Sequence, residues 1–183
     1  MTRPVRNRLL VAAFMVAAFF AAPRLPNAAL WGATALTVPF VALALWVTSP
    51  FHKARTLLRK KQFDEAATEL AAFETSLTQA GWKRALAALA VGLYTSNALA
   101  ASRNTLGAVR LEQGKLDDAS THFKAALEHD ARYAVPWGNL AVLAAMRGDA
   151  VAAEEARAKA AALGFKPKIM AAVIKDKLAA APR

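Results

Sequence analysis

Apolar and polar positions divide the chain into two parts that meet near residue 50. Residues 9–22 and 28–48 are two runs without a charged side chain, and two prolines lie in the short segment between them. After Phe51, apolar side chains recur every three or four positions among charged ones, which is the period of amphipathic helices. The pattern therefore predicts two apolar segments followed by an all-α region.

The apolar run at 28–48 predicts a transmembrane helix. About twenty apolar residues at a rise of about 1.5 Å per residue match a hydrocarbon core about 30 Å thick. Trp31 and Trp46 lie near the two ends of the run, where aromatic rings favour the membrane interface. The shorter run at 9–22 follows three arginines. It fits either the first span of a membrane hairpin over residues 1–50 or a signal peptide.

Basic residues follow the second run and predict its orientation. Positively charged flanks stay on the cytoplasmic side of a membrane, so we expect an integral inner- or plasma-membrane protein whose later residues face the cytoplasm. The same side chains are candidates for contact with anionic lipid, the alternative being a solvated helix face. The basic residues that could contact lipid are Lys53, Arg55, Arg59, Lys60 and Lys61.

A pattern of large and small residues repeats between residues 101 and 166. Four pairs are each separated by 34 positions: Leu106 and Leu140, Gly114 and Gly148, Ala119 and Ala153, and Ala126 and Ala160. A fixed period of about 34 residues with a glycine in the middle is typical of helix-turn-helix repeats. The glycine is expected in the turn between the two helices, because it accepts left-handed dihedral angles.

On these residues, the stretch 101–166 resembles the tetratricopeptide repeat (TPR) family. Residues 51–80 resemble it more loosely, with apolar positions at helical spacing in Phe63, Ala66, Leu70 and Phe73. The resemblance implies a short solenoid of stacked helix pairs with a degenerate first repeat. Stacked repeats need a terminal helix to cover the last apolar face, and residues 167–183 carry the pattern of such a capping helix.

Residues 81–113 separate the degenerate repeat from the two clear ones. No proline interrupts them, and their alanine and leucine content predicts one long helix. The uncharged residues 85–102 leave a third membrane span as an alternative. Three polar side chains near the middle of that stretch, Thr95, Ser96 and Asn97, are costly in lipid, which favours a buried helix.

The net charge of +11 at pH 7 does not indicate a nucleic-acid partner once its distribution is considered. Residues 1–63 hold nine Lys or Arg and no acid, whereas residues 64–183 hold fifteen Lys or Arg against thirteen Asp or Glu. The repeat region is therefore nearly neutral, without a basic groove for nucleic acid. The chain has no cysteine, which excludes disulfides and thiolate zinc sites.

The sequence contains no motif for catalysis. Phosphate-binding loops and nucleophile elbows are absent, and His52, His122 and His129 have no acidic residue at a metal-ligand spacing. We therefore expect no enzymatic activity, no cofactor and no metal.

The TPR resemblance implies that a partner binds in a concave groove lined by the first helix of each repeat. On that analogy the polar groove candidates are Arg103, Asn104, Arg110 and Asn139. Asn and Arg side chains can bind a peptide backbone or a carboxylate. The alternative is that these are ordinary exposed helix residues.

Together these observations predict an all-α protein with an N-terminal transmembrane helical hairpin, a short TPR-like helix-turn-helix solenoid and a C-terminal capping helix. The expected function is a membrane-tethered adaptor of bacterial type that binds a protein or peptide partner at the cytoplasmic face. The alternative is an accessory subunit or assembly factor whose transmembrane helices make the main partner contact.

Overall fold

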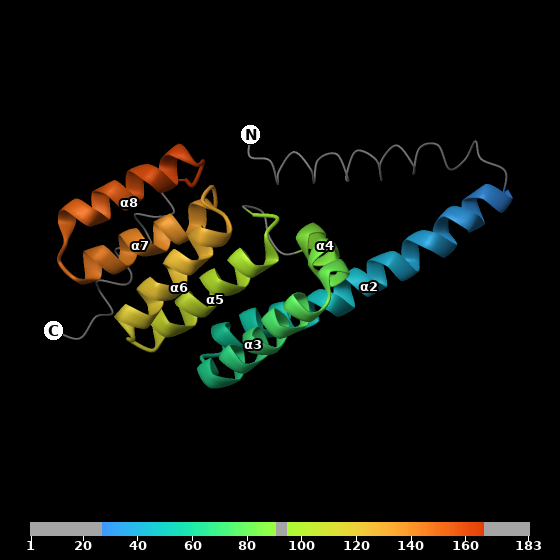
Figure 1. The fold of residues 1–183 in the computed structure, drawn as a ribbon, viewed down its shortest axis with the longest axis horizontal. Coiled ribbons are helices and arrows are strands. Elements are labelled where there is room, and N and C mark those ends of the chain that lie inside the picture. The colour runs from blue at the N-terminus through green and yellow to red at the C-terminus, as the bar shows by residue number, and fades with distance from the viewer. Residues whose placement is uncertain (1–26, 91–94, 167–183) are drawn as a thin grey trace.

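The computed structural model describes residues 27–90 and 95–166, and every regular element in these ranges is an α-helix (Figure 1). The all-α class predicted from the sequence is thus confirmed for the described residues. The helices are α2 (Asn27–Arg59), α3 (Phe63–Gln79), α4 (Gly81–Ala90), α5 (Ala98–Glu112), α6 (Leu116–His129), α7 (Ala134–Met146) and α8 (Ala150–Ala162).

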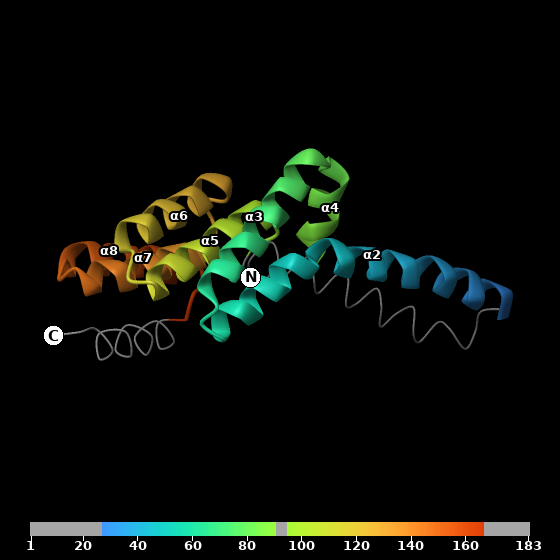
Figure 2. The same cartoon turned by 90° about the horizontal axis from the view of Figure 1, so that it is seen from below.

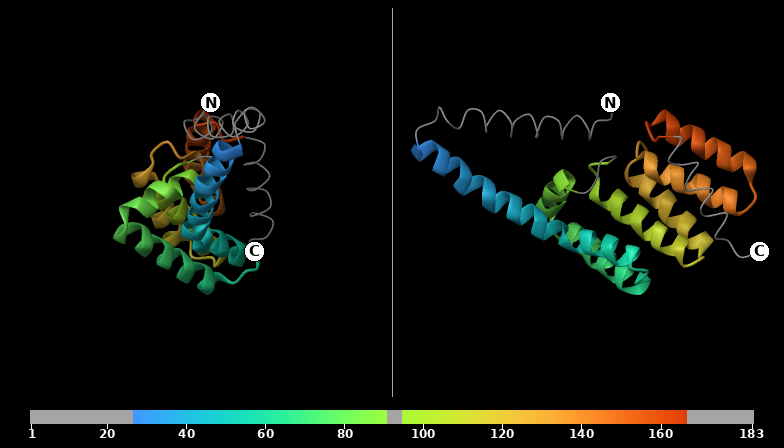
Figure 3. Two further views of the ribbon diagram at one scale, coloured as in Figure 1. Left: turned by 90° about the vertical axis from the view of Figure 1, so that its right-hand side faces the viewer. Right: turned by 180° about the vertical axis from the view of Figure 1, so that it is seen from behind.

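Three helix pairs make up most of the described structure. The C-terminal half of α2 packs on α3, α5 packs on α6, and α7 packs on α8. Helices α5 to α8 lie side by side in chain order, and this is clearest from behind (Figure 3). The first pair joins this group through α3, which contacts α5. The arrangement is a helical repeat-like fold, with pairs stacked along one direction.

The same turn closes each pair. Gly114 and Gly148 have left-handed φ angles of 75° and 76°, and the backbone N–H three residues beyond the end of each first helix donates to a carbonyl of that helix's last turn. The bonds are Gln62 N to Leu57 O at 3.0 Å, Lys115 N to Arg110 O at 2.9 Å and Asp149 N to Ala144 O at 3.0 Å. This is the helix-ending bond pattern that a left-handed residue permits. In the first pair the left-handed residue is Lys61, with φ 60°.

In each of the first two pairs, an aromatic ring of the second helix fills the space between the two helices. Phe123 of α6 is fully buried beside Gly107 of α5. Phe73 of α3 is fully buried and lies 5.5 Å, centroid to centroid, from Phe51 of α2. A glycine is therefore required at position 107, because the Phe123 ring occupies the space that a side chain there would need. The third pair buries Ala141, Ala156 and Ala160, with Trp137 and Phe165 packed against them.

Residues 81–113, which were expected to form one long helix, contain two helices, α4 and α5. Helix α5 begins only after Asn97, whose side-chain oxygen accepts bonds from the N–H groups of Leu99 and Ala100. The polar residues before α5 also bind the end of α6: Thr95 Oγ1 donates to Asp130 at 2.6 Å, and Asn97 Nδ2 donates to the carbonyl of His129 at 2.8 Å. Polar side chains in an apolar stretch therefore mark a helix start.

The predicted transmembrane hairpin and integral-membrane localisation are wrong. In the described part of the chain, no helix is long and apolar enough to cross a membrane. The expected span at 28–48 is the beginning of α2, and its last turns belong to the protein core, where Val47 is buried together with Phe51 and Phe73. The uncharged stretch 85–102 is divided between α4 and α5. The expected elements at 9–22 and 167–183 lie outside the described residues.

Helix α2 is much longer than its partners. Its C-terminal half packs on α3 and α4, while its N-terminal half extends beyond the other described helices (Figure 2). Pro39 and Pro50 both lie inside it.

Gly107→Ala is expected to destabilise the fold by about 1 to 3 kcal/mol, because overpacking a buried contact forces neighbours to move. A Cβ at position 107 would lie 2.5 Å from a carbon of the buried Phe123 ring. Urea unfolding followed by circular dichroism measures the change. The matched control is Gly81→Ala, where no atom lies within 4 Å. Equal free energies of unfolding for the two variants would contradict the close approach.

Lys61→Gly is expected to stabilise the protein by roughly 0.5 kcal/mol, because a left-handed residue with a Cβ is strained and glycine is not. The gain is small since glycine also loses more backbone entropy on folding. Thermal unfolding against Lys60→Gly tests this, because Lys60 does not have a positive φ. A Lys61→Gly variant as destabilised as the control would rule out the strain.

Candidate functional site

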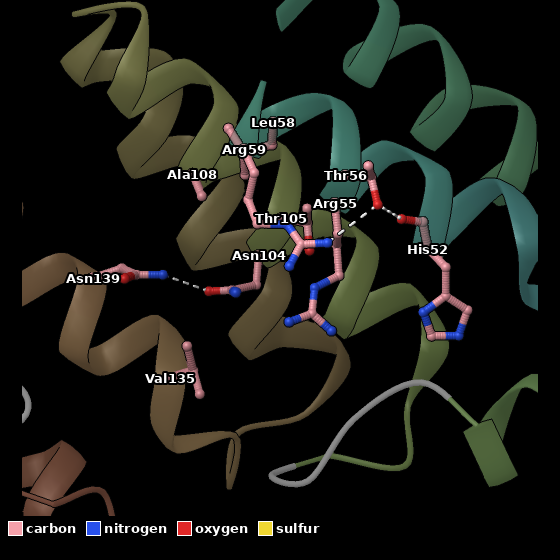
Figure 4. A pocket seen from close by; sticks show the side chains of 10 residues that line it. All are labelled: His52, Arg55, Thr56, Leu58, Arg59, Asn104, Thr105, Ala108, Val135 and Asn139. Atoms are coloured by element: carbon pink, nitrogen blue, oxygen red, sulfur yellow. Dashed lines mark hydrogen bonds between the residues drawn. The ribbon is translucent and has the colours of Figure 1, made fainter. Parts of the chain in front are cut away.

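A cavity of about 530 Å³ lies between the first helices of the three pairs, α2, α5 and α7 (Figure 4). Each of these helices contributes to its wall, so the cavity exists only when all three pairs are stacked. We call it the groove. Its lining residues are His52, Arg55, Thr56, Leu58, Arg59, Asn104, Thr105, Ala108, Val135 and Asn139.

Helix α2 supplies the charged side of the groove. His52, Arg55, Thr56 and Arg59 follow one another at intervals of three, one and three residues, which places them on one face of a helix. The opposite face of the same turns carries the buried residues Ala54 and Leu57. The core contact with α3 therefore orients the two arginines toward α5 and α7.

Two asparagines form the facing wall. Asn139 Nδ2 of α7 donates a hydrogen bond of 2.8 Å to Asn104 Oδ1 of α5, as drawn in Figure 4. This bond uses one donor of Asn139 and the acceptor of Asn104, so the pair keeps an amide oxygen and N–H groups for a ligand. The bond also fixes the two amides relative to each other.

The groove is electropositive. Its lining contains two arginines and no carboxylate. Partial burial and the charge of Arg55 lower the pKa of His52 below its ordinary value of 6.5, so this ring is neutral at pH 7. Burial raises the pKa of Tyr133, while nearby Arg55 opposes that shift. The phenol thus stays protonated beside the arginine. The arrangement can attract and hold an anionic group.

The four predicted groove residues separate into two pairs. Asn104 and Asn139 line the groove and bind each other. Arg103 and Arg110 lie outside it: Arg103 forms an ion pair of 2.8 Å with Glu74 of α3, and Arg110 donates to Gln113 at 2.9 Å. Arg103 and Asn104 are adjacent on α5, and adjacent residues of a helix diverge by about 100°, so the two side chains face different neighbours.

The five basic residues assigned to a membrane surface also separate. Arg55 and Arg59 line the groove. Lys53 is on the other side of α2 and pairs with Glu69 of α3, and Lys60 and Lys61 are exposed at the turn. The sequence could have indicated Arg55 and Arg59 as groove residues, because the loose repeat at 51–80 makes their helix, α2, the equivalent of α5 and α7. The apolar run before them obscured this equivalence.

No family model and no curated protein matches the sequence. Within the described residues, no three His, Asp or Glu side chains gather as metal ligands would.

A pH dependence of stability is expected from His122 of α6, a partly buried histidine that feels the positive charges of Arg103 and Arg110. Burial, Arg103 and Arg110 lower its pKa below 6.5. The unfolded chain then binds more protons than the folded one, so this contribution is complete above pH 6.5 and is lost as pH falls toward the folded value. Urea unfolding between about pH 8 and about pH 5 should show a steeper loss for the wild type than for His122→Gln. His129→Gln, an exposed histidine of the same helix, is the control; a slope unchanged by His122→Gln would contradict the assignment.

Proposed function

We propose that this protein is a TPR-type helical-repeat adaptor that binds an acidic segment of a protein or peptide partner in the groove. The observation that carries the proposal is the meeting of Arg55 and Arg59 with the Asn104–Asn139 pair in one cavity. These side chains come from three separate helix pairs. The alternative function, an accessory subunit or assembly factor that contacts its partner through transmembrane helices, is not proposed, because no described helix is long and apolar enough to cross a membrane.

The chemistry of the groove fits an extended acidic segment. Guanidinium groups bind carboxylates through paired hydrogen bonds, which are stronger than neutral ones. The free amide groups of the asparagine pair complement the N–H and C=O groups of a peptide backbone. Because Arg55 and Arg59 are exposed to solvent, binding should weaken as salt concentration rises.

Replacing both arginines with alanine is expected to weaken binding by more than about tenfold, since a hydrogen bond to a charged group contributes roughly 1.5 to 3 kcal/mol. The probe is a fluorescently labelled short peptide rich in Asp and Glu, and fluorescence anisotropy gives its Kd. Asn104→Ala should also weaken binding, and a peptide with Asn and Gln in place of its acids should bind poorly to the wild type.

The matched control is Arg157→Ala, an exposed arginine on α8 that pairs within its own helix with Glu154. It should bind the acidic peptide like the wild type. Equal affinity in the control and in the Arg55→Ala, Arg59→Ala double variant would reject the groove as the site. Crosslinking in cells followed by mass spectrometry then identifies the natural partner.

A further inference from the structure

The two arginines of the groove are positive charges to which the described fold gives no counter-charge. The guanidinium carbon of Arg55 lies 5.9 Å from the centre of the Phe51 ring, and Arg59 donates a bond of 3.3 Å to the Thr56 hydroxyl. None of the ten lining residues is acidic. The ion pairs printed for the described residues use other basic side chains, namely Lys53, Arg103, Arg147 and Arg157. An anion bound in the groove therefore supplies the missing negative charge.

Both arginines can reach the same bound group. Arg55 and Arg59 are four residues apart on α2, so their backbones are about 6 Å apart along the helix axis. Figure 4 shows both guanidinium groups pointing into the groove on the side of Asn104. Two long, flexible side chains from successive turns thus converge on one part of the cavity.

A buried amide offers a neutral donor in the same cavity. Asn104 is only 7% exposed, and its oxygen accepts the bond from Asn139, so its Nδ2 group keeps N–H donors for a ligand. The hydroxyls of Thr56 and Thr105 donate to carbonyls of their own helices at 3.1 and 2.9 Å. The threonines therefore leave the bound group to the guanidinium and amide donors.

This set of donors fits a phosphoryl group better than a single carboxylate. A carboxylate carries one negative charge, and one guanidinium can occupy both of its oxygens. A phosphorylated side chain carries about −1.5 to −2 charges at pH 7 and has three strong acceptor oxygens. One such group neutralises both arginines and still has an oxygen for the Asn104 amide.

The rest of the groove favours a peptide as the carrier of that group. Leu58, Ala108 and Val135 add aliphatic surface from the three helices, and Asn139 keeps an oxygen that can accept from a backbone N–H. Nucleic acids and anionic membranes present many phosphates and are bound through many basic side chains. Two arginines beside aliphatic and amide groups suit one phosphorylated residue of a peptide instead.

We propose that the groove recognises a peptide segment through one phosphorylated side chain, which bridges Arg55 and Arg59 and accepts a hydrogen bond from Asn104. The inference rests on the proposed function, because the phosphoryl group is the anionic part of the bound segment. Phosphorylation of the partner then controls whether it binds.

Peptide mixtures with one fixed central residue and randomised neighbours test the proposal before the partner is known. The fixed residue is phosphoserine, phosphotyrosine, Asp or Ser, and fluorescence anisotropy of each labelled mixture with the full chain gives an average Kd. At least one phosphorylated mixture should bind about tenfold tighter than the Asp mixture, because it makes an additional hydrogen bond to a charged group. The Ser mixture should bind most weakly.

Single-arginine variants test whether one phosphate contacts both guanidinium groups. In Arg55→Ala and in Arg59→Ala the preference for phosphate over Asp should fall by about tenfold, since the one remaining guanidinium can satisfy either group. Both arginines are exposed, so the variants should keep their helical circular dichroism. The matched control is Lys60→Ala, which removes an exposed positive charge next to Arg59 but outside the groove and should keep the preference.

Equal affinity for the phosphorylated and Asp mixtures overturns the proposal and leaves the acidic-segment function standing. A preference that survives in both arginine variants also overturns it, because the phosphate is then bound elsewhere. If no mixture binds and the peptide rich in Asp and Glu does not bind either, the groove itself is rejected as an anion site.

Two further probes carry the phosphoryl group on other molecules. They are phosphatidylcholine vesicles containing phosphatidic acid, tested by flotation, and a labelled single-stranded RNA, tested by anisotropy. Binding to either probe that is lost in the Arg55→Ala, Arg59→Ala double variant, without a preference for phosphorylated peptides, assigns the site to that carrier and overturns the peptide. Neither probe should bind appreciably if the proposal is correct.

Discussion

The stacking of helix pairs is the constraint on which the rest of this structure depends. A pair of short helices cannot bury its own apolar face, so each pair is stable only against its neighbours. Phe73 and Phe123 fill the space inside the first two pairs, and α3 then covers α5 while α6 covers α7. The close approach at Gly107 keeps the second pair thin enough for this stacking.

Stacking also creates the groove, because it aligns the first helices of the pairs. Arg55, Asn104 and Asn139 are far apart in the sequence, and each belongs to a different pair. None of them would form a site alone. The polar contacts of Thr95 and Asn97 with the end of α6 matter for the same reason, since they set where α5 begins and thus which of its side chains face α2 and α7.

Helix α2 combines three environments along its length and around its circumference. One face of its C-terminal half packs into the core, a second face carries the arginines of the groove, and residues before Val47 expose large apolar side chains. A single apolar run in the sequence therefore serves two different surfaces. This division explains why hydropathy alone suggested a membrane span.

The sequence by itself determined the all-α class, the two clear repeats and their turns, because helical periodicity and glycine at 114 and 148 are local signals. It placed Asn104 and Asn139 among the groove candidates but did not place Arg55 and Arg59 with them. Lys61 occupies the turn position that glycine marks elsewhere, so the first repeat lacked its signature. Only the tertiary structure decided which neighbour buries each apolar face and which side chains share the groove. Apolar character in a sequence shows that a residue favours burial, whereas the surface that buries it is set by contacts between distant segments.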